Sequence, residues 1–130
     1  MEEFFCGRSI SGTTAKPETQ YTEKHMPFWK LDSLELEKFR PGIMSKAEMG
    51  DDLIMVCMRI DAGKEDTGHE HPFDQCGIIL EGQIEMFVGQ ESRLLKATEC
   101  YFIPSGERHG WKTLDNQVKL LDISLKQPRL

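Results

Sequence analysis

Short apolar or alternating segments, separated by turn residues about every 8–12 positions, restrict the fold of this chain more than any other feature. Turns are supplied by pairs such as Pro41-Gly42 and Glu81-Gly82. No segment keeps a helical apolar stripe over the roughly ten residues that a helix needs. The pattern therefore predicts an all-β barrel or sandwich. We expect strands over residues 29–36, 42–46, 53–60, 75–80, 83–88, 91–95, 99–103 and 118–125.

The chain has room for one domain, because its 130 residues fall within the usual domain size of about 100–150 residues. Residues 1–25 are polar, contain Gly7, Gly12 and Pro17 and show no sustained apolar period. We expect an irregular N-terminal arm there. Residues 26–130 are expected to form a single barrel domain.

Charge and cysteine usage exclude several classes of partner. The net charge of −6 is spread along the chain, which argues against nucleic acid or an anionic membrane as the main partner. No apolar run approaches the roughly 18–20 residues of a membrane span, and the N-terminus lacks a signal-peptide pattern, so we expect a cytoplasmic protein. The four cysteines form no C-x-x-C pair, and we expect them to be reduced, with Cys57 and Cys100 packed.

Three of the four histidines form a pattern that suits a metal ion. His69 and His71 lie two positions apart, which directs both imidazoles to one face of an extended strand. Gln75 follows with an amide oxygen as a further candidate ligand, and His109 follows the turn at 104–106. A lone H-x-H is more often a surface feature, but the joint pattern with so few histidines favours a site for a metal that imidazole binds well.

The expected last strand, 118–125, places a carboxylate within an apolar segment. One of its faces carries Val118, Leu120, Asp122 and Ser124. Because burying an unpaired carboxylate is costly, an interior Asp122 needs a partner such as a cation, a metal-bound water or a substrate group. The alternative is an aspartate solvated at the mouth of the barrel.

Residues 63–113 resemble the two motifs of the cupin superfamily, G-(x)5-H-x-H-(x)3,4-E-(x)6-G and G-(x)5-P-x-G-(x)2-H-(x)3-N. The matching positions are Gly63, His69, His71, Gly82, Pro104, Gly106 and His109. Three positions depart from the motifs: Gln75 replaces the glutamate, Thr98 the leading glycine and Thr113 the asparagine. The resemblance implies a double-stranded β-helix, or jelly roll, that binds one divalent transition metal per chain inside the barrel.

The departure at Gln75 changes the chemistry expected of this site. Three neutral imidazoles and a neutral amide leave a divalent metal with a charge of about +2, where a glutamate would leave about +1. Such a site favours an anionic substrate and lacks the carboxylate of the two-histidine-one-carboxylate dioxygenases. The identity of the metal stays open among Zn, Ni, Fe, Mn, Co and Cu.

From His69 to Asp122 the chain is most similar to the small single-domain cupins of pectin and alginate breakdown, which open the ring of 4,5-unsaturated uronate sugars. The shared features are H-x-H-P-x-x-Q, an L-E-G turn at 80–82, I-P-x-x-x-x-H at 103–109 and an L-D near the C-terminus. The resemblance implies that Asp122 is a catalytic acid or base. Ser124 stands where that family has an aromatic residue, and Arg129 aligns with its C-terminal arginine only if one residue is inserted.

Three functions are compatible with these residues. The first is a metal-dependent enzyme for a small, oxygen-rich anion such as an unsaturated uronate, in which Asp122 moves a proton and the metal lies on His69, His71, Gln75 and His109. The second is a metal-dependent dioxygenase, and the third is a non-catalytic cupin that binds or senses a small molecule. Candidate aromatic residues of the pocket are Phe73, Phe87, Tyr101 and Trp111. The resemblance also implies a homodimer, with segments 29–36 and 53–60 as candidate contacts.

Overall fold

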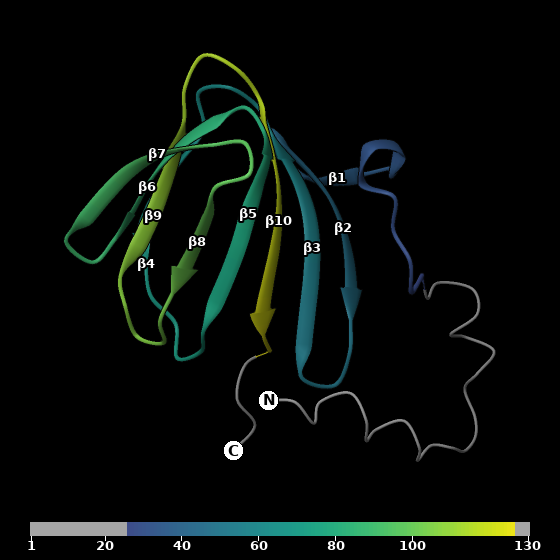
Figure 1. Ribbon diagram of the computed structural model, residues 1–130, viewed down its shortest axis with the longest axis horizontal. Coiled ribbons are helices and arrows are strands. Elements are labelled where there is room, and N and C mark those ends of the chain that lie inside the picture. Colours follow the sequence, from purple (N-terminus) through teal and green to yellow (C-terminus); the bar gives the residue numbers. More distant parts are fainter. Residues whose placement is uncertain (1–25, 127–130) are drawn as a thin grey trace.

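The computed structural model describes residues 26–126, which form two antiparallel β-sheets that face each other (Figure 1). The strands are β1 (Glu37–Arg40), β2 (Ile43–Met49), β3 (Leu53–Ile60), β4 (Glu65–His69), β5 (Gln75–Glu81), β6 (Gln83–Val88), β7 (Glu91–Lys96), β8 (Cys100–Ile103), β9 (His109–Thr113) and β10 (Val118–Leu125). One sheet has the order β1-β2-β3-β10-β5-β8 and the other β4-β9-β6-β7. The predicted all-β fold is confirmed, whereas the predicted arm, residues 1–25, lies outside the described residues.

The core lies between the two sheets and is built from side chains of alternate strand positions. In β6, Ile84 and Met86 are buried while Gln83 and Glu85 are exposed, as expected for a strand with one face toward the core. The complete core cluster comprises Ile43, Ile60, Ile79, Ile84, Met86, Leu95, Tyr101, Ile103, Val118 and Leu120. Burial of each large aliphatic side chain contributes about 1.5–3 kcal/mol to folding.

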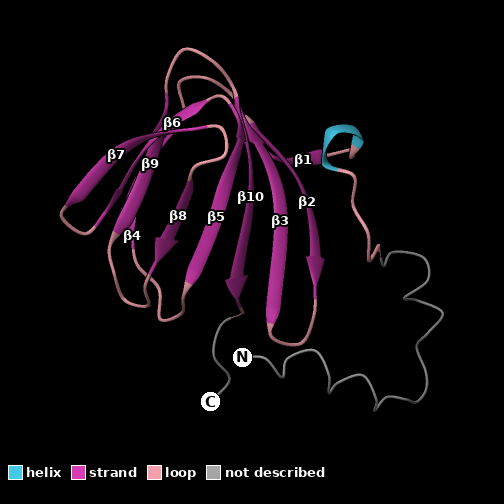
Figure 2. Ribbon diagram, viewed as in Figure 1, coloured by secondary structure: helices cyan, strands magenta, loops and turns pink. Residues whose placement is uncertain are grey.

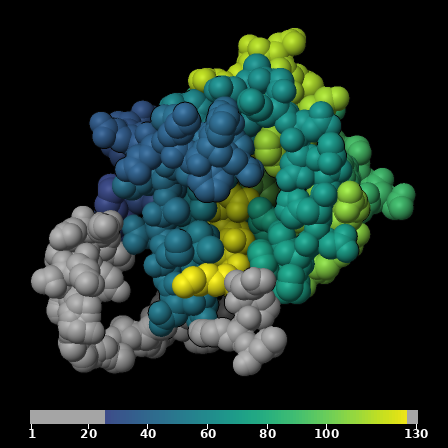
Figure 3. All heavy atoms as spheres, turned by 180° about the vertical axis from the view of Figure 1, so that it is seen from behind, coloured from purple at the N-terminus to yellow at the C-terminus, as the bar shows by residue number. Residues whose placement is uncertain are grey.

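Strand β10 occupies the centre of the six-stranded sheet. It pairs with β3 on one side and with β5 on the other, over nearly its whole length. In the view from behind, its yellow residues lie at the floor of a hollow between blue and teal segments (Figure 3). Asp122, in the middle of this strand, is therefore surrounded by backbone on both sides and is buried.

The strand predictions are accurate where apolar alternation is strong. The segments predicted over 53–60, 83–88 and 118–125 coincide with β3, β6 and β10. Strands β4 and β9 are not predicted, because Glu-Asp-Thr-Gly-His and His-Gly-Trp-Lys-Thr carry polar residues and glycine instead of an apolar pattern. The short, exposed strand β1 is also missed.

The strand predicted over 29–36 is wrong. This segment contains a single 3-10 turn, η4 (Leu31–Ser33), closed by a hydrogen bond from the Ser33 amide to the Lys30 carbonyl (Figure 2). Aspartate and serine favour such local turns over a strand ladder, and Asp32 and Ser33 lie together here. The carbonyl of Leu31 accepts a hydrogen bond from the Lys119 ammonium at 2.6 Å, which fastens the turn to β10. The predicted homodimer therefore loses one of its two candidate contact strands and stays a prediction.

The cysteine prediction is correct at one position and wrong at another. Cys57 is fully buried, but Cys100 is exposed. Strand β8 alternates, so that Tyr101 and Ile103 enter the core while Cys100 points away from it. The three cysteines between residues 26 and 126 are free thiols. No helix in this part of the chain is long and apolar enough to cross a membrane.

Thr98, in the turn between β7 and β8, adopts the left-handed conformation with φ of +73°, which no other non-glycine residue of the described chain shares. The cupin motif has a glycine at this position, and a β-branched residue there is strained by about 1–2 kcal/mol. A glycine at residue 98 would remove this strain, but its larger conformational entropy in the unfolded chain would offset part of the gain in stability. We expect Thr98→Gly to raise the free energy of unfolding in urea by roughly 0.5–1 kcal/mol. Thr98→Ala keeps the backbone strain, so an equal gain from alanine would contradict this explanation.

Candidate functional site

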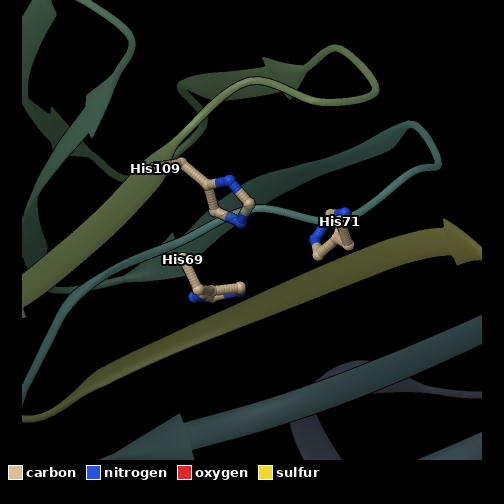
Figure 4. Close-up of side chains that lie close together, drawn as sticks. All are labelled: His69, His71 and His109. Atoms are coloured by element: carbon tan, nitrogen blue, oxygen red, sulfur yellow. The ribbon is translucent and has the colours of Figure 1, made fainter.

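Three histidines converge in the fold, of which His109 is buried, His71 is half-buried and His69 is exposed (Figure 4). His69 ends β4 and His109 begins β9, and the register of these paired strands places the two residues opposite each other. His71 lies two residues beyond β4, and one ligand atom from each histidine lies within 4.8 Å of those of the other two. The predicted convergence is thus correct, but the expectation that both members of H-x-H lie on one strand is wrong. Pro72 follows His71 and has no amide hydrogen to donate to a continued ladder.

Backbone carbonyls orient two of the three imidazoles. Nδ1 of His71 lies 3.2 Å from the Phe73 carbonyl oxygen, and Nδ1 of His109 lies 3.0 Å from the Glu107 carbonyl oxygen. A carbonyl only accepts, so in the neutral imidazoles Nδ1 carries the proton and the lone pair is on Nε2. Metal-binding histidines are held by such acceptors.

His109 has a buried ring nitrogen whose surroundings suit a metal ion. It is 4% exposed, and its Nε2 has no hydrogen-bond partner among residues 26–126. Burial lowers the pKa of His109, which favours the neutral imidazole that a metal requires. A buried lone pair without a donor is costly, and a metal ion at this point would satisfy it.

Gln75, the first residue of β5, joins the histidines to Asp122. Its Oε1 lies 2.8 Å from His71 Nε2, and its amide nitrogen donates to Asp122 Oδ2 at 2.8 Å. The Asp122 carboxylate accepts from the amide nitrogen and thereby directs the amide oxygen of Gln75 toward the His71 imidazole. A neutral His71 has one N–H group, but its ring faces two acceptors, the Phe73 carbonyl and Gln75 Oε1. With the proton on Nδ1, the lone pairs of Nε2 and Oε1 face each other, and a cation bound to both atoms would satisfy them. The arrangement of Gln75 thus suits a metal ligand.

Asp122 is buried beside this cluster. It is 9% exposed and accepts hydrogen bonds from the Gln75 amide and the Tyr101 hydroxyl. Burial raises the pKa of Asp122, although both hydrogen bonds act in the opposite direction. Burial and the neighbouring carboxylate raise the pKa of Tyr101, so the phenol stays protonated. Asp122 is therefore an interior carboxylate with suitable surroundings for proton transfer, and the alternative of a solvated rim residue is wrong.

A cavity of about 100 Å³ brings these groups together. Its polar lining comes from His69, Gln75, His109 and Asp122, and its apolar lining includes Met58, Ile60, Met86, Ile103 and Leu120. Within the described chain, the structure thus gathers all five predicted site residues, because His71 contacts both His109 and Gln75.

The aromatic candidates divide between the site and the surface. Tyr101 and Trp111 line the cavity, and the ring of Phe73 stacks on that of His71 with centroids 4.0 Å apart. Phe87 instead lines a separate groove. Three of the four candidate aromatic residues, Phe73, Tyr101 and Trp111, therefore lie beside the histidine cluster or its cavity.

Asp66 holds the third imidazole and is missed by the sequence reasoning. Its two carboxylate oxygens lie 3.1 and 3.3 Å from His69 Nδ1, and one of them accepts a hydrogen bond from the Gly68 amide at 2.9 Å. Burial raises the pKa of Asp66, but the hydrogen bonds from Gly68 and His69 outweigh it and lower the pKa overall. The only sequence signal is the spacing of three residues before a candidate ligand. An ionised carboxylate behind a histidine orients it and increases its basicity toward a metal.

Removal of the Asp66 carboxylate should weaken metal binding. We expect Asp66→Ala to lower the affinity for a divalent transition metal by about 10–100-fold, measured by competition with a chromophoric chelator. Glu70→Ala is the matched control, because it removes the same charge from an exposed side chain that faces Arg108 at 4.0 Å. An affinity of Asp66→Ala equal to that of the control would show that Asp66 has no part in metal binding.

The donor set limits the kind of metal that fits. Three imidazole nitrogens with one amide oxygen suit Zn, Ni, Fe, Mn, Co or Cu, whereas Mg and Ca prefer sites made entirely of oxygen. The three-histidine cluster could hold such an ion. Its chemistry does not distinguish between these metals.

Comparison with known proteins agrees with this geometry. The model of the cupin domain matches residues 56–124, which include every predicted site residue. The pectin degradation protein KdgF of Dickeya dadantii (strain 3937) is 32% identical over 93 residues, which cover 70% of this chain and 84% of that protein.

Solved structures show the same fold. KdgF from Halomonas sp. matches with a TM-score of 0.68 and 27% identity, covering 78% of this chain and 95% of that one. An RmlC-like cupin from Shewanella frigidimarina NCIMB 400 matches with a TM-score of 0.67 and 23% identity, covering 77% of this chain and 90% of that one, which is a likeness of fold alone. Because the domain match spans more than half of the chain and contains the histidine cluster, the chain belongs to the cupin domain family.

Proposed function

We propose that this protein is a metal-dependent enzyme that opens the ring of a 4,5-unsaturated uronate sugar. The observation that carries the proposal is the meeting of three imidazoles, the Gln75 amide and the buried Asp122 carboxylate around one cavity. The similarity to a pectin degradation protein supports a sugar acid as substrate, because pectin is a polymer of uronate sugars.

The histidine cluster and Gln75 would bind the metal. Held by His69, His71, Gln75 and His109, a divalent ion would supply Lewis-acid chemistry at a sugar oxygen. All four ligands are neutral, so the ion would keep a charge of about +2 beside the Asp122 carboxylate of the same cavity, and this positive charge would attract the carboxylate of a uronate. Asp66 and the carbonyls of Phe73 and Glu107 keep the three imidazoles in the orientation that this requires.

Asp122 would move the proton. Ring opening breaks the bond between C1 and the ring oxygen, and in net terms one proton passes from the C1 hydroxyl to C4, which leaves an aldehyde at C1 and a ketone at C5. The reaction needs no co-reactant, so one group that takes up and returns a proton is sufficient. Asp122 is the carboxylate that lines the cavity, and Gln75 and Tyr101 hold it there.

Turnover of 4,5-unsaturated galacturonate tests the proposal. Purified protein loaded in turn with Zn, Ni, Fe, Mn, Co and Cu should consume this sugar, measured as loss of the ultraviolet absorbance of its C4=C5 double bond. We expect turnover under strict exclusion of oxygen and its loss when the metal is chelated. Turnover that requires oxygen would favour a dioxygenase. No turnover with any of these metals would contradict the proposal and favour a binding or sensing cupin.

A further inference from the structure

We infer that Tyr101 positions Asp122 for proton transfer, and that Gly77 permits this by leaving the space which the phenol occupies. The inference rests on the proposed function, in which Asp122 moves the proton. It concerns a tyrosine that neither cupin motif contains.

The three residues lie in one row across neighbouring strands. Gly77 on β5 pairs with Tyr101 on β8 and with Asp122 on β10. Residues opposite each other on paired strands direct their side chains to the same face, so Tyr101 and Asp122 both face the cavity. The strands that carry them are separated by β5 and hence by roughly 10 Å, twice the spacing of neighbouring strands. A hydrogen bond between their side chains therefore has to cross over Gly77.

Gly77 leaves this path open. A Cβ atom at Gly77 would overlap the hydroxyl oxygen and Cζ of Tyr101, and it would lie 2.6 Å from the Leu121 carbonyl oxygen. The φ of Gly77 is not positive, so glycine is needed there for space and not for its backbone conformation. The absence of a side chain at residue 77 is thus what admits the phenol.

The hydrogen bonds of Asp122 show which of its oxygens is left for a substrate. The Tyr101 hydroxyl and the Gln75 amide both donate to Oδ2. Both hydrogen bonds that Asp122 accepts from residues between 26 and 126 thus go to the same oxygen, and Oδ1 accepts none of them. The two bonds fix the plane of the carboxylate and leave Oδ1 as the atom that exchanges a proton with the sugar. Tyr101 acts through Asp122 and is a positioning residue.

Tyr101→Phe removes the hydroxyl and keeps the ring that packs in the core. We expect kcat for 4,5-unsaturated galacturonate to fall about 10–100-fold, because a preorganised hydrogen bond at the reacting carboxyl is lost. The KM and the metal content per chain should stay at the wild-type values. Phe102→Leu is the matched control, because Phe102 is the next residue of β8, is 59% exposed and should leave kcat unchanged.

A double variant separates positioning from a merely structural role. If Tyr101 acts through Asp122, the variant with both Tyr101→Phe and Asp122→Asn should be no slower than Asp122→Asn alone. A kcat of the double variant that is reduced by the product of the two single losses would overturn this inference and leave the proposed function intact. A wild-type kcat in Tyr101→Phe beside an impaired Asp122→Asn would do the same. An Asp122→Asn variant as active as the wild type would overturn both.

A measurement without substrate tests the positioning if the wild type does not convert this sugar. Crystal structures of the wild type and of Tyr101→Phe should differ in the rotamer or order of the Asp122 carboxylate, with the histidine cluster unchanged. An Asp122 side chain in the same position and equally well ordered in both crystals would overturn the inference on its own.

Discussion

Replacement of Asp122 by asparagine should lower kcat for 4,5-unsaturated galacturonate by about 1,000-fold and leave the metal content per chain unchanged. Asparagine has nearly the shape of aspartate, and its amide oxygen still accepts the hydrogen bonds that Gln75 and Tyr101 donate to Oδ2. It cannot take up a proton. The change therefore removes the proposed chemistry of residue 122 with little change to its packing or to the four metal ligands.

The measurement combines kinetics with elemental analysis of the same preparations. Asp115→Asn is the control, because Asp115 is exposed in the link between β9 and β10 and its replacement removes the same charge. It should keep the wild-type kcat. An Asp122→Asn variant with full metal content and wild-type kcat would remove Asp122 from the mechanism.

Replacement of His109 by alanine should have the largest effect on the metal. His109 is buried, and its Nε2 has no partner within residues 26–126. His109→Ala removes one of the three imidazole ligands, and a water molecule in its place would be a weaker ligand for a transition metal. The effect on affinity should exceed the roughly 10–100-fold expected when a residue behind a ligand is lost. Elemental analysis should show about one transition metal per chain in the wild type and almost none in His109→Ala.

The control for this change is His25→Ala, which removes the one histidine of the chain that does not belong to the histidine cluster. It should retain the metal of the wild type. Full retention in His109→Ala as well would mean that the ion is bound elsewhere or that the remaining ligands suffice, and either result contradicts the role of His109 as a ligand that the centre requires.

Residue patterns predict the fold where one side of a strand is apolar. Strand β6 alternates Gln83, Ile84, Glu85 and Met86, and its predicted bounds agree with the structure. Strands β4 and β9 cannot be predicted from apolar alternation, because their residues are chosen for the candidate site and for close packing against neighbouring strands. Gly110 in β9 is an example, since a Cβ atom there would lie 2.7 Å from the Phe87 ring and 2.5 Å from the Asp66 carbonyl oxygen.

The candidate site divides in the same way. His69 and His71 lie two positions apart, and His109 follows the turn at 104–106, so each of the two motifs is local and the sequence identifies its histidines. The contact between Tyr101 and Asp122 depends on the register of three strands and joins residues 21 positions apart. Neither the periodicity nor the motifs contain this register, which explains why Tyr101 stands out in the sequence only as one of several aromatic candidates.

The central claim is that one transition-metal ion lies between His69, His71, Gln75 and His109 inside the barrel. The most direct test is a crystal of the metal-loaded protein measured at the absorption edge of that metal. We predict a single anomalous peak per chain, about 2.0–2.2 Å from Nε2 of the three histidines and from Oε1 of Gln75. A metal-loaded crystal with no peak at this position, or with its peak at another group of residues, would contradict the account.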